Sequence, residues 1–437
     1  MRAWPIVVGV LLAAGCRESH STEATEAATR AASGSAAIAG TVVEPAPPPA
    51  AVSAGQGRPN LNARPHAHPA VAVAAGDRAF YRSTFSKTPD VRAMMALGAR
   101  VFRDPSLSAS GKLACATCHD PANAFSPPGD LPIQPGGASG ALFGMRAAPT
   151  LRYLQNVPPF SEHYHDSDLN DGFDQGPAGG LTWDGRVQSL HDQARSPLFS
   201  PEEMANQTPA ELAARLRAAA YAGDLKSIFG DDVLASDDSA IKALLYTLEA
   251  YQQDPALFYP YTSKFDQVLH GKAAFSPLEA RGKAIFEDAA RGNCIRCHPD
   301  GGPAPAFTDY GYIALAVPRA RNAAYGGSGK AVVDLGLCGP IRTDLTSHHE
   351  YCGMFRTPTL RNVARKHRFF HNGSLASLRD VIAFYGTRDA TPTRWVSDLP
   401  AAYARNADHD APFGGKTARF SDEEIDALVA FLVTLND

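Results

Sequence analysis

The sequence has little excess charge and no long apolar run. Its 437 residues carry a formal net charge of −4 at pH 7, which provides no basic surface for nucleic acid. The N-terminal apolar stretch, residues 4–14, is too short to span a bilayer. Apolar residues make up 44% of the chain and charged residues 20%, as in ordinary soluble globular proteins. The composition therefore argues against nucleic-acid binding and favours a redox or protein partner, and the length predicts two domains.

The N-terminus is predicted to be an export signal. Arg2 supplies a positive end, the apolar stretch follows, and small residues at 13–15 precede Cys16. This pattern resembles a bacterial lipoprotein signal over residues 1–16, in which Cys16 becomes the lipidated first residue of the mature chain. A simple cleaved signal is the alternative. Residues 17–75 are rich in Ala, Ser, Gly and Pro and show no apolar period, which predicts a disordered linker.

A motif of two cysteines followed by a histidine occurs twice. Two thiols separated by two residues can form thioethers to the two vinyl groups of one haem, and the adjacent imidazole can then ligate the iron. A CxxC pair alone could form a redox disulfide or half of a zinc site, but zinc would need further ligands nearby. Two covalently bound haem c groups are therefore predicted, at Cys115, Cys118 and His119 and at Cys294, Cys297 and His298.

Two further cysteines, Cys338 and Cys352, remain after the signal and the two motifs are set aside. In an oxidising compartment such a pair most simply forms a disulfide, which would stabilise the fold by about 3 kcal/mol. Two free buried thiols are the alternative.

Short helical patterns precede both motifs. Residues 89–102 carry Met94, Leu97 and Val101 on one face, and Thr88 precedes them. Further helices are predicted after Thr208, over 241–251, and after Ser421, where a capping box precedes an apolar stripe. No strand-rich region is present, so the predicted fold is mainly α, with two helical haem domains and long loops. The second motif follows residues 277–286, with Leu278, Gly282 and Ile285 on one face and a capping box of Ser276 and Glu279.

The two halves share further sequence elements, which indicates an internal duplication. Residues 148–152 are echoed by 357–361, and 183–185 by 371–373. Between these elements the first half carries an additional stretch near 161–180. This stretch partly resembles an oxygen-rich calcium loop, although a surface loop is the default interpretation. Its polar residues are His163, His165, Asp166, Asp168, Asn170, Asp171 and Gly172.

These motifs together resemble the bacterial di-haem cytochrome c peroxidase and MauG family over residues 88–437. The resemblance implies two cytochrome c-like domains, here predicted at 76–268 and 269–437, with the haems facing a shared interface. The first-half haem would reduce H2O2, and the second would transfer or store charge. The predicted activity is therefore that of a haem peroxidase.

The resemblance also assigns roles in the first half. Trp183 would be the aromatic residue between the haems, its alternative being a core tryptophan in a turn. Gln193 and Glu203 would form the distal-pocket pair, with Pro197 nearby. A carboxylate beside the iron can move a proton between the peroxide oxygens, so Glu203 is the predicted acid and base. A solvated surface glutamate is the alternative.

The distal ligand of the second haem is predicted to be Tyr385. The peroxidase branch of the family has methionine fourteen residues beyond the equivalent of His371, whereas this sequence has tyrosine there, as in the MauG branch. A phenolate stabilises ferric and higher oxidation states. Tyr385 also fits a helical core stripe, which is the alternative role, and Met354 is the competing ligand.

Two further departures concern the first haem and calcium. Peroxidases of the family that need reductive activation carry a blocking histidine, but residues 136–144 contain none. An open or water-filled sixth position is therefore expected. The family's interdomain ion uses an asparagine where this sequence has Ala147, and Lys366 and Arg368 occupy other positions of that loop. The sequence leaves calcium binding open.

The predicted protein is a periplasmic, lipid-anchored di-haem peroxidase. Its electron donor would be a small cytochrome c or cupredoxin if Met354 ligates the second haem, whereas ligation by Tyr385 favours oxidation of a partner protein. A non-enzymatic electron-transfer cytochrome is the main alternative and predicts two six-coordinate irons. A sensor or assembly protein with a structural haem is a second alternative, for which no specific sequence feature was found.

Overall fold

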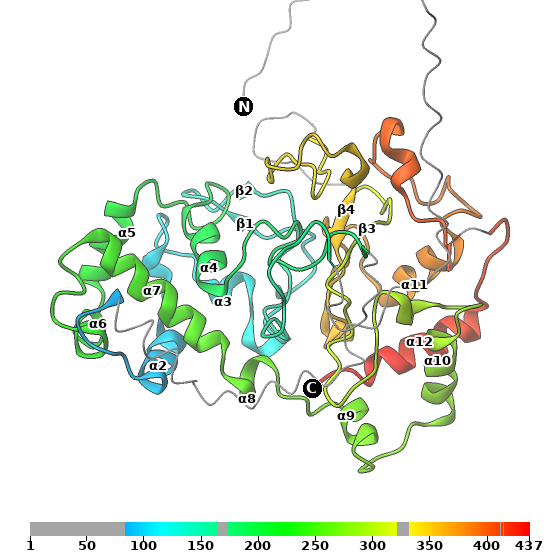
Figure 1. Cartoon of the computed structure of the whole chain (residues 1–437), viewed down its shortest axis with the longest axis horizontal. Helices are drawn as coiled ribbons and strands as arrows, with labels where there is room; N and C mark the ends of the chain where they lie inside the picture. Colours follow the sequence, from blue (N-terminus) through cyan, green and yellow to red (C-terminus); the bar gives the residue numbers. More distant parts are fainter. Residues whose placement is uncertain (1–83, 165–173, 321–331, 411, 414) are drawn as a thin grey trace, which may run out of the picture. The chain divides into compact units, whose positions relative to one another are not determined.

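The computed structural model describes residues 84–164, 174–320, 332–410, 412–413 and 415–437 (Figure 1). All of them belong to one compact unit within residues 54–437. Within these ranges, no helix is long and apolar enough to cross a membrane. Outside them lie the predicted signal, Cys16, the linker over 17–75, and the insert residues His165, Asp166, Asp168, Asn170, Asp171 and Gly172.

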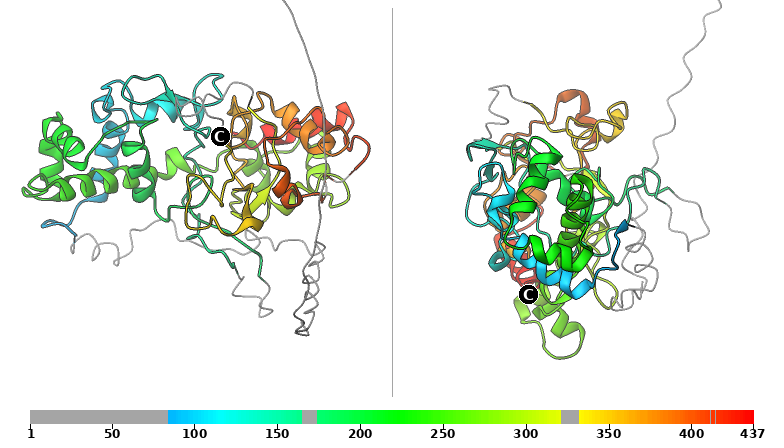
Figure 2. Two further views of the ribbon diagram at one scale, coloured as in Figure 1. Left: turned by 90° about the horizontal axis from the view of Figure 1, so that it is seen from above. Right: turned by 90° about the vertical axis from the view of Figure 1, so that its left-hand side faces the viewer.

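A first group of helices packs around α7 (Asp237–Gln252), with α2 (Val91–Val101), α4 (Leu190–Phe199) and α5 (Pro209–Ala218) in contact with it (Figures 1 and 2). The predicted start of α2 at Thr88 is wrong, because the Asp90 carboxylate caps the helix by accepting from the Ala93 N–H at 2.8 Å. The shorter elements here are η1 (Pro105–Leu107), α3 (Cys115–Cys118), η2 (Pro121–Asn123), α6 (Ala222–Phe229) and α8 (Pro255–Phe258).

A second group packs around α12 (Asp422–Val433), which contacts both α10 (Pro277–Glu287) and α11 (Leu378–Thr387). The predicted capping boxes are present, with Ser276 and Glu279 on α10 and Ser421 and Glu424 on α12. In each box two backbone N–H groups at the start of the helix, which would otherwise lack partners, donate to side-chain oxygens. The shorter elements are α9 (Lys264–Leu269), η3 (Cys294–Arg296), η4 (His349–Tyr351), η5 (Val363–Arg365) and η6 (Ala401–Asn406).

One glycine lies at the main helix crossing of each group. A Cβ at Gly98 of α2 would overlap the Thr247 carbonyl and the Tyr251 side chain of α7. A Cβ at Gly282 of α10 would overlap the Ala427 carbonyl of α12. Because glycine has no side chain, the two backbones touch directly at both crossings. The repeated arrangement agrees with the internal duplication.

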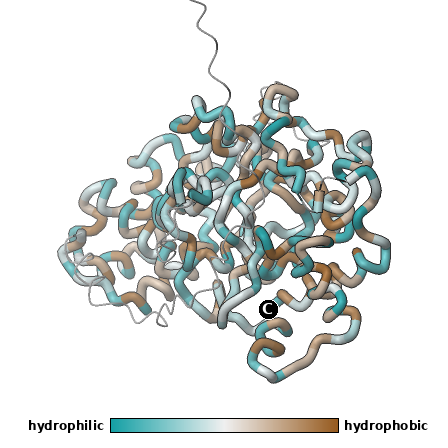
Figure 3. Tube along the Cα trace, turned by 45° about the vertical axis from the view of Figure 1, so that its right-hand side comes forward, coloured by the Kyte–Doolittle hydropathy of each residue, from teal (hydrophilic) through white to brown (hydrophobic). Residues whose placement is uncertain are grey.

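Each helix group encloses its own apolar core. The predicted face of α2 (Met94, Leu97 and Val101) lies in the first core, which extends from Phe85 to Phe258. The second core extends from Phe265 to Leu435. Apolar and polar segments alternate along the helices in Figure 3, as expected for elements with one buried face. Leu278 is 47% exposed and does not belong to the predicted apolar face of α10. The boundary between 268 and 269 stays a prediction.

Strands are few in the described part of the chain. Strand β1 (Pro135–Gly136) pairs antiparallel with β2 (Leu142–Phe143), and β3 (Tyr312–Ala314) pairs antiparallel with β4 (Met354–Arg356). The prediction of a mainly α fold is therefore confirmed. Strand β4 also donates across the two halves of the sequence, because the Arg356 N–H bonds the Trp183 carbonyl at 2.9 Å.

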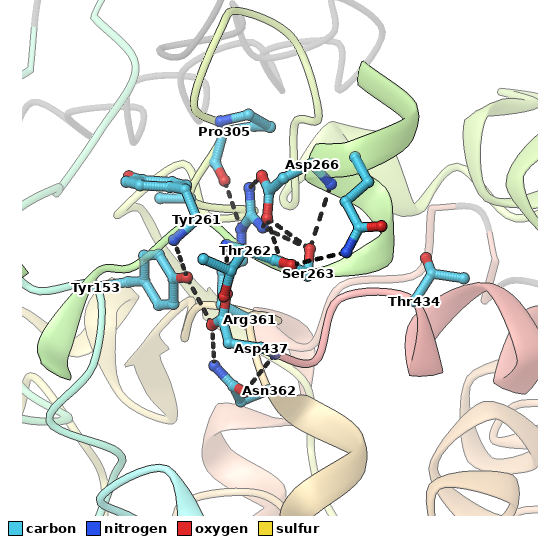
Figure 4. Close-up of polar contacts among 12 residues, drawn as sticks. Tyr153, Tyr261, Thr262, Ser263, Asp266, Pro305, Arg361, Asn362, Thr434 and Asp437 are labelled. Carbon is cyan, nitrogen blue, oxygen red and sulfur yellow. Dashed lines mark hydrogen bonds and ion pairs between the residues drawn. The ribbon is translucent and has the colours of Figure 1, made fainter. Parts of the chain in front are cut away.

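A buried polar cluster joins the two halves near the C-terminus (Figure 4). The Arg361 guanidinium forms two bonds, of 2.7 and 2.9 Å, with the Asp266 carboxylate. The Asp437 side chain accepts from the Tyr153 hydroxyl at 2.6 Å and from the Asn362 amide at 2.8 Å. Because Tyr153 comes from the first half, the end of the chain is tied to it.

Candidate functional site

Each CxxCH motif faces a cavity. The first cavity has a volume of about 640 Å³ and is lined by Cys115, Cys118 and His119. This volume lies in the range of small-molecule and cofactor sites. The second cavity is lined by Cys294, Cys297 and His298. The structure therefore gives each predicted attachment motif a separate internal space.

The two motif histidines are oriented in the same way. His119 Nδ1 lies 3.3 Å from the Phe125 carbonyl oxygen, and His298 Nδ1 lies 2.8 Å from the Phe307 carbonyl oxygen. An Nδ1–H that donates to a carbonyl leaves Nε2 free to ligate a metal. Burial lowers the pKa of both imidazoles, that of His119 to about 4. Both rings are therefore neutral, as a metal ligand must be.

The motif thiols are available for covalent attachment. None of the four motif cysteines forms a disulfide in the described structure. Burial raises the pKa of Cys115 and Cys294 to about 12 and that of Cys118 to about 11. Within the described ranges, no group of three or more His, Cys, Asp or Glu side chains is arranged to hold a metal ion. The half-zinc-site alternative thus lacks its other ligands, and the residues present fit a c-type haem in each cavity.

Polar side chains from α4 and the following turn line the first cavity. Gln193 lies on α4 beneath Pro197, which has no N–H to bond the Gln193 carbonyl. Glu203 lines the first cavity, and its side chain is exposed. The loss of water around it raises the pKa of the Glu203 carboxyl, opposed by the Ser200 hydroxyl and the charge of Arg186. The neighbouring Glu202 lines the same cavity.

The hairpin of β1 and β2 covers another side of this cavity. The Gly137 N–H bonds the Glu203 carbonyl at 2.8 Å, so the hairpin packs against the turn that carries the glutamate. Among the described residues that line the first cavity, His119 is the only histidine. Met145 lines it as well, which the sequence analysis did not anticipate. The signal was present, since Met145 aligns with Met354 in the internal repeat.

Trp183 lines both cavities. Its indole N–H donates to the Ala147 carbonyl at 2.8 Å, and its side chain is buried. The ring meets His371 edge to face, with centroids 6.5 Å apart, and His371 stacks on Phe355 at 3.5 Å. An aromatic series therefore runs from the wall between the cavities into the second half of the chain.

Tyr385 and Met354 differ in their relation to the second cavity. Tyr385 lies on α11 and lines the cavity, stacked on Phe413 with centroids 5.2 Å apart. Burial, followed by the charges of the motif cysteines, raises the pKa of its hydroxyl. In β4, Phe355 lines the cavity, whereas the Met354 side chain packs against a separate apolar cluster that includes Tyr312. Met354 and Phe355 are adjacent in the strand, so their side chains point to opposite faces.

A buried ionic network adjoins the wall between the cavities. The Arg146 guanidinium bonds the Asp184 carboxylate at 2.6 Å and the Asp334 carboxylate at 2.6 and 2.8 Å. Arg186 bonds the same Asp184 at 2.8 and 2.9 Å. Sequence reasoning missed this network, because its members are widely separated along the chain. Arg146 and Asp184 come from the first half and Asp334 from the second, so the network joins the two halves.

The remaining predicted residues lie apart from the cavity walls, with one exception. Cys338 and Cys352 form a disulfide. His163, in the described part of the insert, is exposed and bonds Asp174 at 2.6 Å. Arg368 donates to the Asp130 carbonyl at 2.6 Å. Lys366 is the exception and lines the second cavity.

The fold and the two cavities, each lined by a CxxCH motif, are those of a c-type cytochrome with two haem sites. The family model described as di-haem cytochrome c peroxidase matches residues 92–274. The methylamine utilization protein MauG of Paracoccus denitrificans is 36% identical, over 79% of this chain and 89% of its own length. The cytochrome c551 peroxidase of Nitrosomonas europaea is 29% identical, over 68% of this chain and 74% of its own.

A solved structure shows the same similarity. The di-haem peroxidase BthA from Burkholderia thailandensis superposes with a TM-score of 0.70 at 36% identity, over 80% of this chain and 87% of that one. The chain belongs to the di-haem cytochrome c peroxidase family, whose members are oxidoreductases acting on peroxide. Membership implies two c-type haems, and the non-enzymatic alternative is not favoured.

Proposed function

We propose that the chain reduces hydrogen peroxide in the His119 cavity and keeps a second redox centre in the His298 cavity. The supporting observation is an asymmetry between the cavities. Both are lined by Trp183, but the carboxylate of Glu203 lines only the first. The overall reaction takes up two electrons and two protons per H2O2 and releases two water molecules. The first cavity therefore requires a group that moves protons.

Glu203 is the proposed proton-transfer group. A haem attached at Cys115 and Cys118 would supply the iron at which peroxide binds, with His119 as its proximal ligand. The Glu203 carboxylate accepts a proton from one peroxide oxygen and returns it to the other, which leaves as water. Its raised pKa suits this exchange, since the carboxyl then holds and releases a proton nearer to neutral pH. The Gln193 amide orients the peroxide by hydrogen bonding.

Tyr385 is the proposed ligand of the second iron. It lines the second cavity, whereas Met354 faces away from it, and this difference favours tyrosine over the competing methionine. An anionic oxygen ligand stabilises the oxidised metal. The second centre would then hold oxidising equivalents, and Trp183 would conduct electrons between the two. Oxidation of a partner protein is favoured over turnover with a small cytochrome c or cupredoxin.

The proposed location is the periplasm, with a lipid anchor at Cys16. The support is the order of features at the N-terminus, where a positive residue and an apolar run precede small residues and a cysteine. The mass of the mature N-terminal peptide tests this proposal. A diacylglyceryl modification on Cys16 is expected, and an unmodified N-terminus would contradict it.

The decisive experiment adds H2O2 to the fully oxidised protein without prior reduction and records the haem absorption spectrum. A rapid change is expected, because His119 is the only histidine among the described residues that line the first cavity. An unchanged spectrum would contradict the open site and leave Met145 as a candidate sixth ligand. Glu203→Gln should slow the change far more than Glu202→Gln, which removes a carboxylate one residue away. The opposite order would transfer the acid and base role to Glu202.

A further inference from the structure

Arg356 is a buried cation that lies against both cavities. Its side chain is 8% exposed, and it is among the residues that line the first and the second cavity. Its Nε donates to the Thr182 carbonyl at 3.1 Å, and its backbone N–H donates to the Trp183 carbonyl at 2.9 Å. These two bonds fix the arginine to the turn that carries Trp183. They involve no carboxylate.

The other buried arginines of the described chain each have a carboxylate partner. Arg146 pairs with Asp184 and Asp334, and the remaining three do so within 2.8 Å. A buried charge without a partner is strongly unfavourable, so folded proteins normally pair it. Arg356 therefore differs from every other buried arginine among the described residues. The three pairs are Arg342 with Asp344, Arg361 with Asp266, and Arg388 with Asp389.

The surroundings of Arg356 do not compensate its charge. Burial lowers the pKa of the Arg356 guanidinium, and the groups that oppose this effect are the phenols of Tyr312 and Tyr310. Those phenols have pKa values raised by burial and are neutral. The terminal nitrogens of the guanidinium thus have no described carboxylate to bond. Arg356 lines both cavities, so a carboxylate bound in either one is a candidate partner.

Lys366 is a second cation without a bonded carboxylate in the described part of the chain, and it lines only one of the two cavities. Lys366 lines the second cavity but not the first. Burial lowers the pKa of its ammonium group to about 8, and no charged group offsets this effect. Two cations without a bonded carboxylate among the described residues, Lys366 and Arg356, therefore line the second cavity. Arg356 also lines the first cavity. An anionic group bound in the cavities would compensate these charges.

We propose that Arg356 is a carboxylate-binding residue shared by the two cavities, and that its ligands are the propionate groups of the two haems. A guanidinium presents paired N–H donors that match a carboxylate. Each haem carries two propionates, which supply the missing negative charge. This inference rests on the proposed occupancy of both cavities. Arg356 also bonds the carbonyls of Thr182 and Trp183. It would therefore connect the propionates of both haems to the turn that carries Trp183.

The test compares three single charge removals. Arg356→Gln removes the shared cation, Arg186→Gln removes one that lines only the first cavity, and Lys366→Gln removes one that lines only the second. The reduction potential of each haem is measured by spectroelectrochemistry. A nearby positive charge favours the reduced state, so its loss lowers the potential. Arg356→Gln should lower both potentials, Arg186→Gln only the first, and Lys366→Gln only the second.

Several outcomes would overturn the proposal. If Arg356→Gln shifts neither potential, or one alone, the arginine is not shared. Arg356→Lys keeps the charge but loses the paired donors, so both potentials should change together and by less than in Arg356→Gln. A shift confined to one haem in the lysine variant would also contradict the proposal, even if the glutamine variant did not fold.

Two controls are needed. The first distinguishes haem propionates from a free anion as the source of the carboxylate, and the second tests whether both cavities hold a haem. If a free anion occupied the site, the wild-type potentials would depend on acetate or chloride concentration at constant ionic strength, and Arg356→Gln would abolish that dependence. Haem propionates predict no such dependence. The haem-to-protein ratio of the wild-type chain, from the pyridine haemochrome spectrum, tests the proposed occupancy independently. A ratio below two would refute the proposed function and the sharing of Arg356 with it, whereas a ratio of two with unshifted potentials in Arg356→Gln would refute the assignment of Arg356 alone.

Discussion

The indole nitrogen of Trp183 donates a hydrogen bond of 2.8 Å to the carbonyl oxygen of Ala147. Ala147 donates its own N–H to the His371 carbonyl at 2.7 Å. The aromatic ring that lines both cavities is thus tied to backbone from each half of the chain. A fixed ring between two redox centres favours electron exchange over a constant distance.

Replacing Trp183 with phenylalanine should separate the two centres kinetically. The variant loses both the indole hydrogen bond and an easily oxidised ring. The first haem should still react with peroxide, while the accompanying change at the second haem slows by about tenfold or more, a barrier increase of about 1.4 kcal/mol. Stopped-flow absorption spectroscopy measures both. Trp395→Phe is the matched control, since Trp395 bonds Thr387 and lines neither cavity. Equal behaviour of the two variants would contradict the relay.

The second haem should depend on Tyr385. Tyr385→Phe removes the proposed oxygen ligand, so the absorption and electron paramagnetic resonance spectra of that haem should change while those of the first do not. Met354→Leu should leave both spectra unaltered, because the Met354 side chain packs away from the second cavity. If only the methionine variant alters the spectrum, the ligand assignment is wrong.

The peroxide reaction should depend on pH through Glu203. Desolvation by the surrounding protein raises the pKa of this carboxyl, and the ionised form is the one that accepts a proton. The rate should therefore fall as the pH drops through a value above the ordinary carboxyl range. Glu203→Gln should remove this acid limb, and Glu202→Gln should retain it. Single-turnover rates measured between about pH 4 and pH 8 decide the matter.

The Arg361 and Asp266 pair should contribute strongly to stability. Both side chains are almost completely buried, so Asp266→Ala leaves a charge without its partner. The free energy of unfolding should fall by about 3–5 kcal/mol, measured by denaturant titration. The control is Asp224→Ala, which breaks a surface pair with Arg100 whose side chains are about half exposed. That change should cost about 0–1 kcal/mol. Equal losses would contradict the proposed role of burial.

Local patterns allowed much of the site to be predicted from the sequence. The CxxCH motifs and the Ser276 and Ser421 capping boxes are each defined within a few residues. The start of α2 was misplaced because both Thr88 and Asp90 can cap a helix, and only the backbone decides which one does. Leu278 was assigned to the apolar face, but its position in the first turn of α10 leaves it exposed.

Other features depend on three-dimensional proximity and could not be predicted in this way. Met354 and Phe355 are adjacent in sequence, yet the strand directs only Phe355 to the cavity. The role of Arg356 depends on two cavities meeting at one side chain. Its only sequence signal is that the repeat has Ala147 at the matching position. A large cation stands there in place of alanine.

The glycines at the helix crossings have a consequence for engineering. At Gly98 and Gly282 any larger side chain would force the paired helices apart, so each crossing permits a single spacing. Substitutions at these two glycines would therefore disturb the helix frame next to each attachment motif. A library restricted to the turn around Trp183 and to strand β4 could retune the chemistry without redesigning the scaffold.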